Sequence, residues 1–150
     1  MTDTPQDNRY RPEDRIMQGV IPYLSLPGQA GAAADFYALA FAAKDIGRMD
    51  FPGQPGRYMH VQVDINGGAL MLTDHSQDPE ATGSPMPRGH LQLVVPDGRA
   101  WFDRAVAAGC EVVMPYERQP WGDDWGMVRD PFGLLWAMLT PNPALWDKGM

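Results

Sequence analysis

Hydrophobic and polar residues alternate over residues 20–26, and this alternation predicts a short first strand. The chain breaks at Pro27-Gly28 and continues into the alanine-rich segment 30–43, for which we expect a helix. Proline and glycine are frequent over residues 47–57, so this segment is expected to form a loop.

The clearest alternation in the chain lies at residues 58–65. Its apolar face is made of Met59, Val61, Val63 and Ile65, and its polar face of Tyr58, His60, Gln62 and Asp64. Asn66-Gly67 follows, and both residues tolerate the positive φ of a tight hairpin turn. We therefore expect a hairpin whose returning strand covers residues 69–73.

A similar order of elements is predicted after residues 75–89, a segment with few hydrophobic residues that we interpret as a linker or a lid. Residues 90–95 alternate and predict a strand. A helix is expected to run to Ala108, with Asp97 as its cap and Gly109 as its stop.

Three further strands are predicted in the second half, at residues 111–114, 126–129 and 134–140. A loop is expected over residues 119–125. The turn Asp130-Pro131-Phe132-Gly133 predicts a second hairpin, because proline presets φ and glycine accepts a left-handed conformation.

Landmarks in the two halves recur at nearly the same offset, although the first strands, which start at Ile21 and His90, are 69 apart because residues 27–33 are longer than their counterpart. Three pairs lie 66 positions apart: Phe36 and Phe102 in the helices, Gly67 and Gly133 in the hairpins, and Met71 and Ala137 in the strands that follow. One half is too small to form a stable fold alone, so the two halves are expected to cover each other's apolar faces. The alternative is a dimeric ferredoxin-like domain, which would lack the second hairpin at Gly133.

The ordered motifs resemble those of one known superfamily. They are Ile21-Pro22-Tyr23-Leu24-Ser25-Leu26, Ala34-Asp35-Phe36-Tyr37, Met71-Leu72-Thr73-Asp74, Val113-Met114-Pro115, Trp121-Gly122-Asp123, and Arg129-Asp130-Pro131-Phe132-Gly133 with Trp136. Together they resemble the PhnB-like branch of the vicinal oxygen chelate superfamily, which is also called the glyoxalase/bleomycin resistance/dioxygenase superfamily.

The resemblance implies an α+β fold in which two βαβββ modules form a curved mixed sheet around a cleft. The chain then divides into an N-terminal arm at 1–17, a first module at 18–74, a linker or lid at 75–89, a second module at 90–141 and a C-terminal tail at 142–150. The resemblance also implies a homodimer. It fixes no activity, because this fold carries many chemistries.

Composition and charge restrict the classes of binding partner that are expected. The formal net charge of −7 argues against nucleic acid, whose phosphates an acidic surface repels. No apolar run reaches the length of a membrane span, and the first residues lack a secretory signal, so we expect a cytoplasmic protein. Cys110 is the only cysteine and is interpreted as a small buried hydrophobe.

Enzymes of this superfamily commonly bind a divalent metal at four positions. The resemblance places these at Ile21, Met71, His90 and Ala137, of which only His90 offers a ligand for a hard or borderline cation. We therefore predict no metal and no other cofactor. The alternative is a divalent metal held by His60, His90 and a carboxylate such as Asp64.

The polar strand faces are expected to line the cleft and to bind a small organic ligand. The predicted ligand-binding residues are Tyr23, Ser25, Gln62, Met71, Thr73, Gln92, Trp121, Asp123, Trp125 and Ala137. His60 and His90 are the candidate catalytic groups, because imidazole titrates near neutral pH. Alternatively, each histidine is only a hydrogen-bonded residue of the cleft wall, and the polar strand faces are simply exposed to solvent.

Asp123-Asp124 lies between Trp121 and Trp125, and it is a candidate rim that closes over a ligand. Carboxylates beside aromatic rings can hold a cation, as in the bleomycin-resistance members of the superfamily that sequester basic drugs. Alternatively, the two tryptophans anchor their loop on the sheet edge.

Three functions remain open on the sequence. The first is a metal-free protein that binds a small organic molecule in the cleft between modules, with or without a reaction. The second is a metal-dependent lyase, isomerase or ring-cleaving dioxygenase. The third is a non-catalytic module that docks another protein through its polar sheet face.

Overall fold

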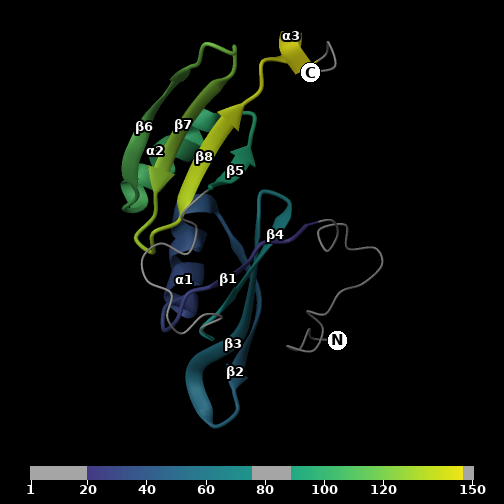
Figure 1. Cartoon of the computed structure of the whole chain (residues 1–150), viewed down its shortest axis with the longest axis vertical. Coiled ribbons are helices and arrows are strands. Elements are labelled where there is room, and N and C mark those ends of the chain that lie inside the picture. Colours follow the sequence, from purple (N-terminus) through teal and green to yellow (C-terminus); the bar gives the residue numbers. More distant parts are fainter. Residues whose placement is uncertain (1–19, 76–88, 147–150) are drawn as a thin grey trace. The chain divides into compact units, whose positions relative to one another are not determined.

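The computed structural model describes residues 20–75 and 89–146 (Figure 1). The described residues form two compact units, of which unit 1 takes residues 20–38 and 42–75 and unit 2 takes residues 39–41 and 89–146. The predicted arm at 1–17 lies outside the described residues, as do nearly all of the predicted linker and the end of the predicted tail.

Unit 1 contains a four-stranded mixed sheet and one helix. Its elements are β1 (Tyr23–Ser25), α1 (Ala30–Phe41), β2 (Lys44–Phe51), β3 (Gln54–Ile65) and β4 (Gly68–Thr73). The strand order is β1-β4-β3-β2. β1 pairs in parallel with β4, and the other neighbours are antiparallel.

Unit 2 repeats this topology. Its elements are β5 (Leu91–Val94), α2 (Gly98–Ala108), β6 (Glu111–Arg118), β7 (Asp124–Arg129), β8 (Leu135–Thr140) and α3 (Pro143–Trp146). The strand order is β5-β8-β7-β6, again with one parallel pair, β5 with β8. The predicted α+β fold of two βαβββ modules is confirmed, and each module forms a mixed sheet of its own. The second hairpin, which the ferredoxin-like alternative lacks, is present.

The loop predicted over residues 47–57 is wrong. β2 and the start of β3 occupy most of this segment and pair with each other, for example Arg48 with Val61. Gly53 and Gly56 have φ of 72° and 85° and lie around the tip of this hairpin. Among the described strands β2 lies at the sheet edge and pairs only with β3. Its residues are half-buried or exposed, so they carry no apolar alternation.

A β-bulge interrupts the alternation predicted for residues 58–65. Met49 pairs with His60 and Asp50 pairs with Tyr58, so Met59 is the extra residue. Met59 is consequently 38% exposed rather than in the core. The Tyr58 ring turns toward α1, where a Cβ on Gly31 would lie 2.6 Å from its Cε2 atom. The predicted placement of Met59 and Tyr58 is therefore wrong, whereas Val61, Val63 and Ile65 are buried as expected.

The predicted turns and caps have the expected geometry. Asn66 and Gly67 have φ of 51° and 80°, as a tight hairpin needs. The Asp97 carboxylate accepts a hydrogen bond from the Ala100 amide at 3.1 Å, and Gly109 ends α2 with a φ of 126°.

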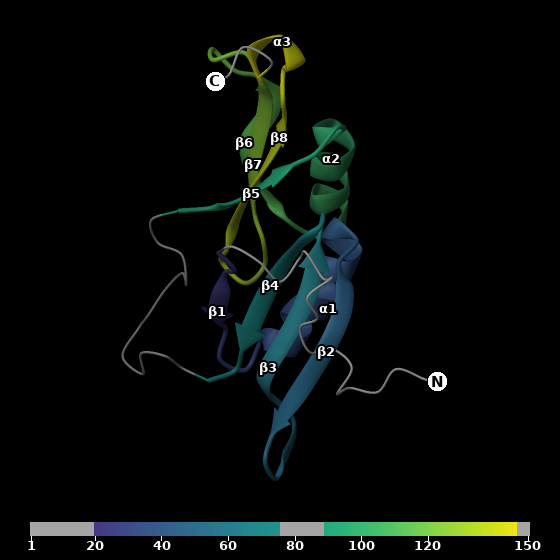
Figure 2. The ribbon, with the colours of Figure 1, turned by 90° about the vertical axis from the view of Figure 1, so that its right-hand side faces the viewer.

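The helices cover one face of their sheets, and Figure 2 shows α2 lying beside the second sheet. In unit 1 the fully buried side chains include Tyr37, Val61, Val63 and Leu72. The buried positions Ala30, Ala34 and Tyr37 of α1 match Gly98, Phe102 and Ala105 of α2 at an offset of 68. The proposed match of Phe36 with Phe102 is therefore wrong, because unit 1 has two more residues than unit 2 between the first residue of its helix and the hairpin glycine, from 30 to 67 against 98 to 133.

A side chain at the end of the parallel pair holds the helix in each unit. Asp74 is buried and accepts hydrogen bonds from the amides of Ala30 at 3.0 Å and Tyr58 at 2.8 Å. Thr140 lies 66 positions later, and its hydroxyl accepts from the Gly98 amide at 2.8 Å. The two units thus secure the first turn of their helices from equivalent positions by different chemistry.

In the described part of the chain, no helix is both long enough and apolar enough to span a bilayer.

Candidate functional site

Tyr23 and His60 form a hydrogen-bonded pair on the first sheet. The phenol oxygen of Tyr23 lies 2.8 Å from Nδ1 of His60, and the rings meet edge to face with centroids 5.4 Å apart. Burial lowers the pKa of the His60 imidazole and raises the pKa of the Tyr23 phenol, which favours the neutral form of both. A neutral phenol donating to Nδ1 places the imidazole proton on Nε2.

Three predicted ligand-binding residues lie in one row across the first sheet. Met71 on β4 is paired with Tyr23 on β1 on one side and with Gln62 on β3 on the other. Gln62 is only 6% exposed, and its amide nitrogen donates to Asp64 at 3.3 Å. This row combines a phenol, a thioether and an amide, which is a surface suited to a small organic molecule.

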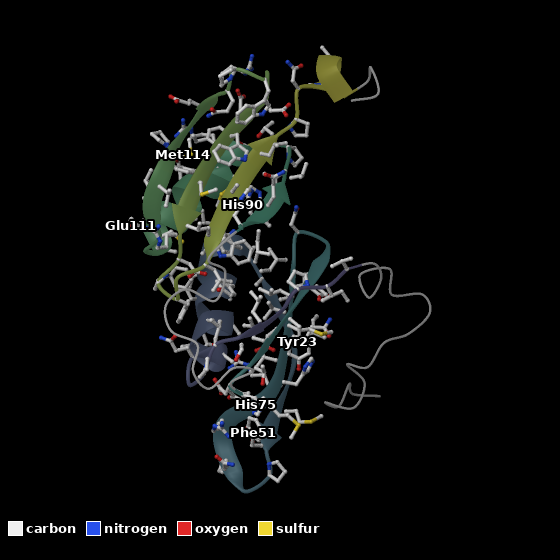
Figure 3. The ribbon with its side chains drawn as sticks, viewed as in Figure 1. Tyr23, Phe51, His75, His90, Glu111 and Met114 are labelled. Atoms are coloured by element: carbon white, nitrogen blue, oxygen red, sulfur yellow. The ribbon has the colours of Figure 1, made fainter. Side chains whose placement is uncertain are left out.

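The hydroxyls of Ser25 and Thr73, both predicted to bind the ligand, contact His75 instead. Ser25 and Thr73 are paired across the parallel strands. The Ser25 hydroxyl donates to the His75 carbonyl, and the Thr73 hydroxyl accepts from the His75 amide at 3.0 Å. The His75 ring lies 6.4 Å from the Phe51 ring, and Figure 3 labels both at the first sheet. These two hydroxyls therefore fix the chain as it leaves β4.

In unit 2 a hydrogen-bonded chain links His90, Gln92 and Trp125. The indole nitrogen of Trp125 donates to Oε1 of Gln92 at 3.2 Å, and Nε2 of His90 lies 3.2 Å from the same oxygen. The rings of His90 and Trp125 meet edge to face at 6.1 Å. We call these three residues with Trp121 the indole face; Figure 3 labels His90 at the second sheet.

The indole face lies on the side of the sheet opposite α2. On β7, Gly126 faces the helix, since a Cβ there would lie 2.9 Å from the Phe102 ring. Trp125 therefore points the other way, because neighbouring residues of a strand alternate. It packs with Ala137 and Leu139 in a buried cluster, with Met127 at its side. The predicted residue Ala137 thus supports the indole instead of standing free.

Trp121 provides the exposed ring of the indole face. Its side chain is half exposed, and its centroid lies 5.9 Å from that of the nearly buried Trp125. Gln119 holds the loop in place: its amide nitrogen donates to the carbonyls of Trp125 at 3.0 Å and Glu117 at 3.2 Å. The two tryptophans therefore present one fixed and one accessible aromatic surface.

The carboxylates predicted to form a rim have internal partners. Asp123 is buried and accepts from the Asn142 amide at 2.8 Å, which ties the chain after β8 to this loop. Asp124 accepts from Arg118 at 2.6 Å. Both contacts favour the anchoring interpretation of this loop over a rim that holds a cation.

The residues present do not fit a divalent metal of the superfamily type. Of the four expected positions, Ile21 has no donor, Ala137 is fully buried in the apolar cluster, and Met71 offers only a thioether. His90 is left alone, and its Nε2 faces Gln92. Nor do the described residues contain a group of three or more His, Cys, Asp or Glu side chains arranged to hold a metal ion.

Several residues that shape the indole face were not predicted from the sequence. Gln119 fixes the loop, and Met127 and Leu139 support Trp125. Met127 and Leu139 alternate with Val128 and Met138, which are fully buried on the opposite face of β7 and β8. That alternation is visible in the sequence and marks a second apolar face on these two strands.

A family model described as Glyoxalase/Bleomycin resistance protein/Dioxygenase superfamily matches residues 23–138. An uncharacterized protein of Mycobacterium tuberculosis (strain ATCC 25618 / H37Rv) is 40% identical over 139 residues, which cover 85% of this chain and 79% of that protein.

Solved structures resemble the whole fold. TioX from Micromonospora sp. ML1 is 25% identical with a TM-score of 0.61, over 82% of this chain and 98% of that one. The PhnB protein from Bacillus cereus has a TM-score of 0.63 over 83% of this chain and 100% of its own, and at 20% identity it shows likeness of fold alone.

Proposed function

The chain belongs to the glyoxalase/bleomycin resistance protein/dioxygenase superfamily, and on that basis we propose that it binds a small organic molecule without a divalent metal. We place the principal contact on the indole face of unit 2. The observation that carries this proposal is the chain of hydrogen bonds from Trp125 through Gln92 to His90, next to the half-exposed ring of Trp121.

This arrangement suits a planar ligand. Trp121 offers a flat apolar surface, and aromatic rings that stack on or meet such a surface gain about 0.5–1.5 kcal/mol beyond burial. Gln92 and His90 place polar atoms beside Trp125, whose ring meets that of Trp121, and few but fixed polar groups are what orient a ligand in a binding site. Because Trp125 is held from both sides, little order has to be gained on binding.

Should the bound molecule react on the indole face, we propose that His90 exchanges protons with it. His60 lies on the sheet of unit 1, and we propose it as the corresponding group for a molecule bound there. His60 is suited to accept a proton only weakly, because burial lowers its pKa. Its partner Tyr23 is a neutral phenol able to donate a hydrogen bond.

Binding is tested by titrating planar organic molecules into the full chain and following its indole N–H signals by NMR, with melting temperature as a second readout. We expect Trp121→Ala to weaken binding about tenfold, equivalent to about 1.4 kcal/mol. Val106→Ala is the matched control, because Val106 lies on α2, which covers the other side of the sheet, and is itself exposed. Failure of every planar molecule to bind, or equal binding by both variants, would refute the proposal.

The metal-free part of the proposal has its own test. Dialysis against a chelator should leave the melting temperature and the ligand affinity unchanged. Stoichiometric Mn, Fe, Ni or Zn that is lost on His90→Ala would favour the metal-dependent alternative.

We also propose a cytoplasmic homodimer. The support for self-association is the edge strand β6, on which Val112, Val113 and Met114 are between 37% and 45% exposed. Light scattering coupled to size exclusion should give twice the chain mass of 16.6 kDa.

A further inference from the structure

The hydrogen bonds of the indole face fix which atoms of Gln92 and His90 donate and which accept. An indole N–H can only donate, so the Gln92 atom 3.2 Å from Trp125 must be the oxygen. His90 Nε2 faces the same oxygen at 3.2 Å, and two acceptors would repel, so Nε2 must carry a proton. In the neutral imidazole the other nitrogen, Nδ1, is then an acceptor.

The burial of Trp125 keeps the donor and acceptor atoms of Gln92 from exchanging places. The Trp125 side chain is only 9% exposed, so its N–H has little access to water. A flipped Gln92 amide would bring its NH₂ group against the indole N–H and leave a largely buried donor without an acceptor. The cluster of Ala137 and Leu139 beneath the indole holds the ring in its place.

Two polar groups remain available to a ligand. Within residues 20–75 and 89–146, the amide nitrogen of Gln92 and Nδ1 of His90 have no hydrogen-bond partner. Gln92 and His90 are both exposed. The indole face therefore presents a donor from Gln92 and an acceptor from His90 beside Trp125, whose ring meets the accessible ring of Trp121.

We infer that the ligand of the indole face is a neutral planar ring that bears a lactam or carboxamide group. Its carbonyl oxygen accepts from Gln92 Nε2, and its N–H donates to His90 Nδ1. This inference rests on the proposed function and specifies its ligand class. A carboxylate is disfavoured, because it lacks the N–H for Nδ1 and meets a chain of net charge −7.

The test compares two probes, oxindole and indole. Both are bicyclic and carry one N–H, but only oxindole has the lactam carbonyl. Each is titrated into ¹⁵N-labelled full-length protein, and the side-chain signals of Gln92, Trp121 and Trp125 are followed. We expect oxindole to bind at least tenfold more tightly than indole and to shift the Gln92 amide signal selectively.

The variant Gln92→Glu keeps an oxygen for Trp125 and His90 but replaces the outward NH₂ donor by a carboxylate oxygen. We expect the preference for oxindole to fall from tenfold to about one. Retention of the Trp125 indole N–H signal shows that the internal bond survives. Should this variant not fold, the ratio of the two affinities in the wild-type protein decides alone.

The outcomes separate the two proposals. If oxindole and indole bind equally tightly to the wild-type protein, the lactam inference is overturned while the proposed function stands. If the preference exists but Gln92→Glu leaves it intact, Gln92 is not the donor and the inference is likewise overturned. If neither probe binds while planar carboxylates do, the ligand class is wrong. If no planar molecule binds at all, both proposals fail.

Discussion

Replacement of Asp74 tests the account of how unit 1 is held together. The carboxylate is 4% exposed, and its two oxygens accept from different backbone amides, those of Ala30 in α1 and Tyr58 in β3. Hydrogen bonds to charged groups contribute about 1.5–3 kcal/mol each, and solvent screening is small at this burial. One side chain therefore joins the end of β4 to the helix and to the neighbouring strand.

Asp74→Asn keeps one acceptor oxygen and turns an NH₂ group toward the other backbone N–H. We expect it to lower the free energy of unfolding by about 2–4 kcal/mol, because one bond is lost and a buried donor is left unpaired. Asp74→Ala loses both bonds and should cost about 3–6 kcal/mol. Asp97→Ala is the control: this exposed residue caps α2 through one bond, and its loss should cost about 1 kcal/mol.

Urea denaturation provides the measurement, with two probes. All five tryptophans lie between positions 101 and 146, so fluorescence reports on unit 2, whereas far-ultraviolet circular dichroism reports on both units. Diverging midpoints in Asp74→Asn would show that unit 1 melts before unit 2. If both Asp74 variants cost less than Asp97→Ala, the carboxylate does not carry the role assigned to it.

Three further predictions concern single sites. Gly126→Ala should destabilise unit 2 by at least about 1–3 kcal/mol in urea melts, because its Cβ would lie 2.7 Å from the Cα atom of Tyr116 and backbone cannot give way; an unchanged midpoint would contradict this. The His60 imidazole should titrate by NMR below its ordinary pKa of 6.5, because burial lowers its pKa in the folded protein. As the pH drops from 6.5 to the folded pKa, the unfolded chain takes up this proton before the folded one does, so the free energy of unfolding should fall. His60→Gln should remove this pH dependence of stability. Cys110, whose thiol pKa burial raises to about 12, aided by the charge of Asp130, should react with a disulfide reagent at pH 8 only on unfolding, and rapid labelling of the folded protein would show that the thiol is accessible.

The sequence predicted the central strands and missed much of the edges, for a physical reason. Residues 61–65 alternate because one face packs in the core, and that pattern is visible without a structure. β2 and β6 lie at the edges of their sheets and have few buried residues, so their pairing leaves little trace. The strand predicted over residues 111–114 stopped before Pro115, yet an edge strand tolerates proline and β6 continues to Arg118.

The candidate site was predictable in its residue types but not in its contacts. Gln92 and Trp125 were both expected to bind a ligand, but Trp125 was assigned to a loop. Its contact with Gln92 requires that β7 begin at Asp124 and pair Trp125 with Leu139, and such register is fixed only in three dimensions. The same holds for Ser25 and Thr73, whose hydroxyls are used by His75.

The helices of the two units carry a large and a small side chain at two equivalent positions, but in opposite order. Ala34 and Tyr37 in α1 correspond to Phe102 and Ala105 in α2. At these two positions each helix thus carries one buried ring, at the second position in α1 and at the first in α2. A recombinant that took one of the two positions from each half would place two rings where one fits, or none where one is needed. Because the two halves carry their rings at opposite positions, substitutions at these positions are expected to occur in pairs during evolution. The helix of one half is therefore not interchangeable with the helix of the other.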